Sequence, residues 1–322
     1  MGSPAQPSEF GSRPPNLRGY PGAMPADSSL ISVTAKIAAY YRQFSDIPFA
    51  QEVAKRIGAD AAFDQILTEH GLNKEKLTFY APMFEARYKS LTQLILQSGA
   101  SQVLELASGY SLRGLDLTRG GAIRYVETDL PNVVAAKLTL LDDVRNAHGI
   151  PRSPQHVVTT ADALDFDQVR AAAAGLDPSQ PLTVLCEGLI MYLSKEQTEQ
   201  LAAHVRRLLQ AFAGGCWITP DFTFKPDARD LPPERLRLRE AITGVTQRQM
   251  DASSFEDDQD LATFLAGAGF NVQVRSQVDE TPSFSSIQAL GLSPTSIDRL
   301  RGLLRVWVMT ATPERRSVPR RV

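Results

Sequence analysis

Three acidic residues in the middle of the chain each follow a short apolar segment, and their positions favour the binding of a ligand. They are Asp129, Asp162 and Glu187. If these segments are parallel strands, their carboxyl ends meet at one edge of a sheet. Carboxylates there can accept hydrogen bonds from ribose hydroxyls or from the exocyclic amine of adenine, or pair with an ammonium group. The pattern therefore indicates a ligand that carries an adenosine.

The turn after the first predicted strand is rich in small residues but lacks the full glycine pattern of dinucleotide-binding proteins. In Glu105-Leu-Ala-Ser-Gly109 the first glycine of that pattern is replaced by Ala107, and no third glycine follows. The pattern serves close approach to a pyrophosphate, so a ligand without phosphates needs it less. S-adenosylmethionine (SAM), which joins an adenosine to an amino-acid zwitterion, is such a ligand. A turn with a purely structural role is the alternative.

Each candidate side chain also has a plain structural interpretation. Asp129 can cap the following helix. Glu127 is an alternative acid for the ribose, because it points to the same face of the strand as Asp129. Asp162 can be an ordinary loop residue. Glu187 can pair either with a ligand ammonium group or with a structural arginine. Arg87, on the helix before the first strand, can bind a ligand carboxylate bidentately or lie on the surface.

Composition narrows the class of protein. The chain has 322 residues, of which 43% are hydrophobic and 22% charged, as in a globular protein. A net charge of −2 provides no overall positive field, so we expect neither nucleic acid nor a membrane as a partner. The two cysteines and four histidines lack metal-ligand spacing, so we expect no metal. Without a signal peptide or a spanning run of about 20 apolar residues, a cytoplasmic protein is expected. The oligomeric state is not indicated.

The chain divides into three parts by pattern. Residues 1–26 are rich in Gly, Pro and Ser, and Glu9-Phe10-Gly11-Ser12 matches two adjacent cloning sites, so we interpret them as a vector-derived or disordered tail. Residues 27–98 show helical periodicity after a cap at Asp27, and 99–322 alternate strands with helices, which predicts an α/β core around a parallel sheet. The strands are predicted at 103–106, 124–128, 156–160, 182–187, 216–222, 271–275 and 305–311.

Residues at about 225–256 break this alternation. The stretch carries Arg235, Arg237, Arg239 and Arg248 and little apolar content. It is either a helical insert that covers the site and recruits an anionic substrate, or a solvated surface helix.

Five motifs, in order, resemble those of the leucine carboxyl methyltransferase family, which includes the tetracenomycin-type polyketide O-methyltransferases. The resemblance covers about 84–217. The motifs are Glu85-Ala-Arg-Tyr-Lys-Ser-Leu-Thr-Gln-Leu-Ile95, Val103-Leu-Glu-Leu-Ala-Ser-Gly109, Tyr125-Val-Glu-Thr-Asp-Leu-Pro131 with Val134-Ala-Ala-Lys137, Ala161-Asp-Ala163, and Glu187-Gly-Leu-Ile-Met-Tyr-Leu193. Two departures are Ala107, where the family has glycine, and Tyr110-Ser-Leu-Arg113, where it has Asp-Thr-Arg.

The resemblance implies a class I, Rossmann-like SAM-dependent methyltransferase with a seven-stranded sheet. It implies that Arg87 binds the SAM carboxylate, that Asp129 binds the ribose and that Glu187 binds the amino group. Asp162 and Ala163 would then contact the adenine. The cofactor-binding residues that we expect are Arg87, Glu105, Ala107, Ser108, Gly109, Asp129, Leu130, Asp162, Ala163 and Glu187.

Methyl transfer from a sulfonium is a direct displacement that depends on alignment, and an ionised carboxylate acceptor needs no general base. The resemblance implies O-methylation of a carboxylate or hydroxyl, on a small molecule or peptide. Tyr192, after the strand that precedes Glu187, is the candidate for orienting the acceptor, and a packing aromatic is the alternative. Tyr40 and Tyr41 are further candidates of this kind. A non-catalytic SAM-binding protein and a nicotinamide-dependent oxidoreductase are the competing functions.

Overall fold

The strands form one mostly parallel sheet in the order β3-β2-β1-β4-β5-β7-β6. The computed structural model describes residues 28–225, 233–246 and 254–313. β1 to β5 are parallel, whereas β7 is antiparallel to both β5 and β6. The strands are β1 (Gln102–Leu106), β2 (Arg124–Asp129), β3 (His156–Thr160), β4 (Leu182–Cys186), β5 (Gly215–Thr219), β6 (Phe270–Ser276) and β7 (Arg305–Ala311). The order reverses between β1 and β4, where open α/β sheets bind ligands.

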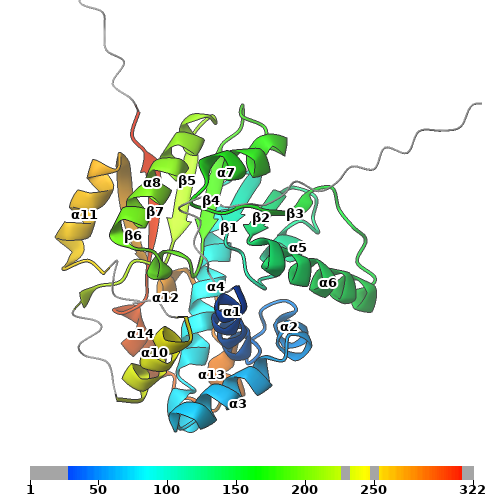
Figure 1. The fold of residues 1–322 in the computed structure, drawn as a ribbon, viewed down its shortest axis with the longest axis vertical. Coiled ribbons are helices and arrows are strands. Elements are labelled where there is room, and N and C mark those ends of the chain that lie inside the picture. Colours follow the sequence, from blue (N-terminus) through cyan, green and yellow to red (C-terminus); the bar gives the residue numbers. More distant parts are fainter. Residues whose placement is uncertain (1–27, 226–232, 247–253, 314–322) are drawn as a thin grey trace, which may run out of the picture.

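Helices cover both faces of the sheet, and a further helical group lies at one end of it (Figure 1). That group contains α1, α2, α3, α10 and α13, and α4 extends from it to the sheet. The helices are α1 (Ser28–Arg42), α2 (Ala50–Arg56), α3 (Ala59–His70), α4 (Tyr80–Gln97), α5 (Arg113–Leu117), α6 (Pro131–His148), α7 (Phe166–Ala172), α8 (Lys195–Gln210), α10 (Pro233–Thr246), α11 (Asp258–Gly267), α12 (Gln277–Glu280), α13 (Ser285–Ala289) and α14 (Thr295–Arg301), with short 3-10 turns η1 (Glu75–Leu77), η2 (Ala173–Gly175) and η3 (Ile190–Tyr192).

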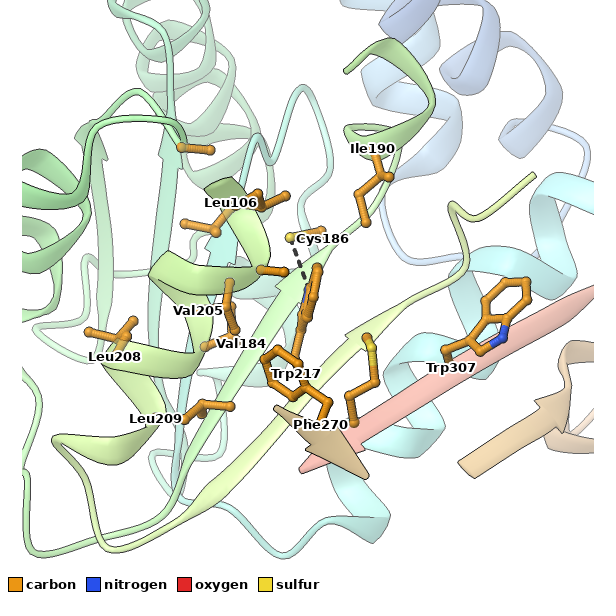
Figure 2. Close-up of a cluster of buried hydrophobic side chains, with 14 of the residues drawn as sticks. Leu106, Val184, Cys186, Ile190, Val205, Leu208, Leu209, Trp217, Phe270 and Trp307 are labelled. Carbon is orange, nitrogen blue, oxygen red and sulfur yellow. Dashed lines mark hydrogen bonds between the residues drawn. The ribbon is translucent and has the colours of Figure 1, made fainter. Parts of the chain in front are cut away.

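Alternating side chains of β1 pack into two different cores. Val103 packs with Leu91 of α4, whereas Leu104 packs with α8 on the opposite face. Successive side chains of a strand point to opposite faces, so a strand between two helical layers presents apolar residues to both. Trp217 of β5 is fully buried in the α8 core, and its indole N–H donates to the sulfur of Cys186 at 3.3 Å (Figure 2).

The predicted α/β sheet is confirmed, and most strand bounds agree within one or two residues. The strand predicted at 216–222 ends earlier, at Thr219, because Pro220 has no N–H for the ladder. The segment between β6 and β7 had no prediction and forms α12, α13 and α14. The predicted tail at 1–26 and the cap at Asp27 lie outside the described residues, and the predicted division at residue 98 stays a prediction.

The described part of the chain contains neither a membrane-spanning helix nor a group of metal-binding side chains. No helix there has the length and apolar character needed to cross a membrane. Nor does any group of histidine, cysteine and acidic side chains within those residues have an arrangement that could hold a metal ion.

The core around Trp217 gives a stability prediction. Trp217→Ala should lower the free energy of unfolding by about 3–5 kcal/mol, because it removes a large, fully buried ring and leaves a cavity. The control Leu138→Ala, at a side chain that is 40% exposed, should change it by less than about 0.5 kcal/mol. Urea unfolding measures both, and equal effects of the two changes would contradict the core assignment.

Candidate functional site

One cavity of about 500 Å³ opens at the carboxyl ends of β1, β2 and β4. This volume lies within the range of small-molecule sites, roughly 300–1,000 Å³. The ten expected cofactor-binding residues and Tyr192 all line it: Arg87, Glu105, Ala107, Ser108, Gly109, Asp129, Leu130, Asp162, Ala163, Glu187 and Tyr192. Of the two further tyrosine candidates, Tyr41 lines it and Tyr40 does not. The fold therefore brings the predicted residues together, while the role of each stays a prediction.

A fully buried guanidinium joins two of the carboxylates. Arg113 donates through one terminal nitrogen to Glu105 and through the other to Glu187, each at 2.7 Å. Its Nε donates to the hydroxyl of Thr92 at 3.1 Å, and the group lies 4.3 Å from the ring centre of Tyr88. The planar fork of arginine suits such a bridge, because its donors point in fixed directions. Arg113 thus joins β1, α4 and the end of β4, and its two carboxylate partners line the cavity.

Glu187 is surrounded by arginines from three helices. Besides Arg113, it accepts a hydrogen bond from Arg42 of α1, and the Nε of Arg87 on α4 lies 3.6 Å from its Oε1. Burial works to raise the pKa of Glu187, but Arg42, Arg113 and Arg87 outweigh it and lower that pKa to about 2. The carboxylate therefore stays ionised at every physiological pH.

A further buried carboxylate orders the chain that follows Glu187. Asp221, which is 2% exposed, accepts hydrogen bonds from the backbone N–H groups of Gly188, Leu189 and Ile190 at 2.9, 2.7 and 3.2 Å. Arg87 pairs with the same carboxylate. Gly188 takes a φ of 80°, which glycine adopts without strain. Asp221 thereby fixes the turn that presents Glu187 to the cavity.

Charges at this end of the cavity balance. Three guanidinium groups and three carboxylates lie together: Arg42, Arg87 and Arg113 with Glu105, Glu187 and Asp221. Buried charges persist when they are paired. A ligand group that is itself a zwitterion can enter such a cluster without adding net charge.

The small-residue turn after β1 contacts the tip of β2. Asp129 accepts hydrogen bonds from the backbone N–H groups of Gly109 at 2.7 Å and Leu130 at 2.8 Å, and burial raises its pKa. Ala107 has a φ of 54°, in the left-handed region where glycine is favoured. The unusual alanine therefore keeps a glycine-like backbone. The N-cap of α6 is Leu130 and no side chain caps the helix, so the cap expected from Asp129 is not formed. Asp129 lines the cavity, and its contact with a ligand stays a prediction.

Glu127, the rival acid, lies deeper and does not line the cavity. It is fully buried, with the Nζ of Lys137 at 3.1 Å and the Nε2 of His156 at 2.8 Å. Arg145 donates to the Nδ1 of His156 at 3.0 Å, so Nε2 carries the proton that His156 gives to Glu127. Lys137 also donates to the hydroxyl of Ser108 at 2.9 Å, which connects this network to the turn. Depth, not direction, distinguishes the two acids.

The other predicted residues have plain local roles as well. Oδ1 of Asp162 accepts from the N–H of Leu164 at 2.9 Å, and Ala163 is buried beside it. Tyr192, in η3, is hydrogen-bonded to Thr34 of α1, and burial raises its pKa, so its hydroxyl is protonated at neutral pH. Tyr192 can therefore donate a hydrogen bond but cannot serve as a base.

The proposed arginine lid is only partly described. Arg237 of α10 is 59% exposed and outside the cavity lining, and Arg248 lies outside the described residues. The helix contributes Leu238 to the lining instead. Among its described residues, α10 therefore contributes an apolar side chain to the cavity rather than a charged one.

Sequence reasoning missed three charged residues of the site: Arg42, Arg113 and Asp221. Arg113 lies in the loop Tyr110-Ser-Leu-Arg113, which departs from the family pattern Asp-Thr-Arg but keeps its arginine. The sequence therefore offered a signal for Arg113 that was not assigned a role. Asp221 fell within the strand predicted at 216–222. Arg42 lies 145 residues before Glu187 and carries no local signal.

Comparisons with known proteins agree with this geometry. A sequence model of the family described as leucine carboxyl methyltransferase matches residues 44–206, about half of the chain. A Mycobacterium avium protein is 24% identical over 87% of this chain and 95% of its own length. A Mycolicibacterium smegmatis protein is 26% identical over 70% and 68%. Both are named for S-adenosyl-L-methionine-dependent methyltransferase activity.

A solved structure shares the fold. The Thermobifida fusca YX protein, named for methyltransferase activity, has a TM-score of 0.51 and 15% identity over 86% of this chain and 94% of its own. At this identity the likeness concerns the fold alone.

The environment of Glu187 gives a pH prediction. Its pKa is lower in the folded chain than the ordinary 4.5, so its stabilising contribution is present above pH 4.5 and is lost as the pH falls toward 2. This contribution is on the order of 3 kcal/mol. The side chain of the Glu187→Gln variant cannot titrate. Between pH 4.5 and 2 the free energy of unfolding of the wild type should therefore fall by about 3 kcal/mol more than that of the variant.

Urea unfolding at a series of pH values measures the effect. Glu199→Gln, at an exposed position on α8, is the control and should follow the wild-type curve. Parallel curves for Glu187→Gln and the wild type would contradict the prediction.

Proposed function

Since this chain belongs to the leucine carboxyl methyltransferase family and uses SAM as its methyl donor, we propose that it is an O-methyltransferase acting on a carboxylate or hydroxyl. The observation that carries the oxygen assignment is the composition of the cavity wall. Among its described residues there is no histidine, lysine or cysteine to act as a general base. Carboxylates that could do so are held by arginines or backbone N–H groups. Such a site suits an acceptor that is already ionised or readily becomes so.

The charged end of the cavity fits the amino-acid part of SAM. We assign the SAM carboxylate to Arg87, with Arg42 beside it, because guanidinium groups bind carboxylates bidentately. The buried Nε of Arg42 has no hydrogen-bond partner among the described residues, which leaves a donor for this purpose. Glu187 would bind the ammonium group. A zwitterion placed here keeps the cluster balanced.

The other end fits the nucleoside. Asp129 uses one lone pair of each oxygen on backbone N–H groups, and each oxygen retains another for a ribose hydroxyl. Asp162 and Ala163, after β3, would contact the adenine. Phosphate-free ligands suit this turn, since Ala107 carries a methyl group where a pyrophosphate would need glycine.

SAM, when bound, would supply a methyl group activated by a positive sulfur. An acceptor oxygen would form a bond to the methyl carbon as the carbon–sulfur bond breaks, and the neutral thioether would be the leaving group. The protein's contribution is then alignment and exclusion of water. α1 supplies one wall, with Thr34 bonded to Tyr192 and Arg42 bonded to Glu187. Tyr192, which is protonated, would orient the acceptor oxygen by donating a hydrogen bond.

The role of Asp129 can be tested by affinity. Asp129→Asn should weaken binding of S-adenosylhomocysteine about ten- to a hundredfold, because it removes charge-assisted hydrogen bonds to the ribose. Asp143→Asn, at a half-exposed carboxylate on α6, should leave the affinity unchanged. Calorimetric titration measures both variants, and equal affinities would remove Asp129 from the cofactor site.

The atom that receives the methyl group tests the proposed function directly. SAM labelled with carbon-13 in its methyl group is incubated with the protein and panels of carboxylic acids, phenols, amines, thiols and peptides. The label should appear as an O-methyl ester or ether, which carbon-13 NMR distinguishes from N-, S- and C-methyl products. Transfer to another atom would overturn the oxygen assignment, and SAM binding without transfer to any panel member would favour the non-catalytic alternative.

A further inference from the structure

One buried cation near the cavity has no part in the function proposed above. Lys137 of α6 is fully buried, and it does not line the cavity. A buried ammonium group is costly unless it is paired, and replacing a buried ion pair by apolar side chains of similar volume is often neutral or stabilising. Stability alone therefore does not explain why a lysine stands at this position.

The surroundings of Lys137 are closed to ligands. Its Nζ lies 3.1 Å from Oε1 of Glu127, and the other oxygen of that carboxylate bonds His156. Gly114 of α5 packs directly on this pair, since a Cβ there would lie 2.8 Å from Nε2 of His156 and 2.9 Å from the carboxyl carbon of Glu127. None of these four residues lines the cavity. Any effect of Lys137 on a ligand must therefore pass through another residue.

Ser108 makes that connection. The Nζ of Lys137 donates to its hydroxyl at 2.9 Å, and Ser108 lines the cavity in the turn after β1. Two backbone bonds also hold this turn: the N–H of Ser108 donates to the carbonyl of Thr128 at 2.9 Å, and the N–H of Gly109 donates to Asp129 at 2.7 Å. A hydrogen bond from a charged donor is about twice as strong as a neutral one. Lys137 thus adds a charge-assisted anchor on the buried side of the turn.

The turn needs such an anchor because Ala107 is strained. Its φ of 54° lies in the left-handed region, which costs an alanine a free energy equivalent to about a five- to thirtyfold shift of an equilibrium. If the anchor were removed, part of the population would relax at Ala107 and displace the backbone of Gly109. A ligand that requires the strained turn would then bind more weakly, in proportion to the fraction of the protein that lacks it.

We propose that Lys137 is a positioning residue for SAM, which holds Ser108 and thereby keeps the strained turn at Ala107 in the shape that receives the cofactor. This inference rests on the proposed placement of SAM at this turn, and it extends the cofactor site to a residue outside the cavity. Glu127 and His156 keep the ammonium group of Lys137 paired and in place.

A rescue experiment tests the anchor. Ser108→Ala removes the hydrogen bond but leaves Lys137 beside Glu127, and it should weaken S-adenosylhomocysteine binding about three- to tenfold in calorimetric titration. Ala107→Gly alone should leave the Kd within about twofold. Added to Ser108→Ala, it should restore most of the lost affinity, because glycine adopts this φ without strain. A direct contact between Ser108 and the ligand would not be restored, so rescue distinguishes anchoring from contact.

The matched control removes a buried hydroxyl elsewhere. Thr198 of α8 is fully buried, donates to the carbonyl of Ser194 at 2.9 Å and does not line the cavity. Thr198→Val should keep the wild-type Kd for S-adenosylhomocysteine even if its Tm falls. A loss of affinity equal to that of Ser108→Ala would show that the effect is general destabilisation and would count against the inference.

The part of Lys137 is tested by a double-mutant cycle. Lys137→Met removes the ammonium group and keeps an unbranched side chain. In this background Ser108→Ala should change the Kd by less than about twofold, because the anchor is already lost. If Lys137→Met does not fold, the rescue by Ala107→Gly decides alone.

Three results would overturn the inference: an unchanged Kd for Ser108→Ala, no rescue by Ala107→Gly, or the full effect of Ser108→Ala in the Lys137→Met background. Failure of Asp129→Asn to weaken S-adenosylhomocysteine binding would instead refute the placement of SAM at this turn. The two failures are therefore distinguishable.

Discussion

The buried guanidinium of Arg113 is the interaction on which the rest of the site depends. It bridges Glu105 of β1 and Glu187 at the end of β4, the two strands that meet where the sheet order reverses. A buried charge costs several kcal/mol unless it is paired with good geometry. This bridge is satisfied only when the two strands are neighbours. The contact that helps to hold the sheet together therefore also sets the direction of the carboxylate that faces the ligand.

The helical group belongs to the site as much as the sheet does. α1 brings Arg42 to Glu187, and α4 brings Arg87 to Asp221. Both helices are held by apolar packing, α4 directly against the sheet, so the positions of these cations follow from the core. A reaction that depends on alignment requires such fixed surroundings more than it requires a reactive side chain.

Much of this arrangement could be predicted from the sequence, and the exceptions have physical reasons. Short apolar strands that alternate with helices specify the sheet. An acid at the end of such a strand, such as Asp129, must lie where the carboxyl ends of the parallel strands meet. Arg42 could not be found because helical periodicity does not distinguish a buried arginine from a solvated one. Asp221 was hidden because Pro220 ended its strand before the apolar pattern did. The short helices after β6 have too few turns to show a period.

The antiparallel direction of β7 has a consequence for biosynthesis. It places Trp307 beside Thr219, at the edge where β5 ends, so the pocket takes walls from both Arg42 and Trp307. Chains leave the ribosome amino end first. A nascent chain without its last described strand would expose the edge of β5 and an unfinished pocket. The pocket is therefore complete only after β7 has been synthesised and has paired with β5.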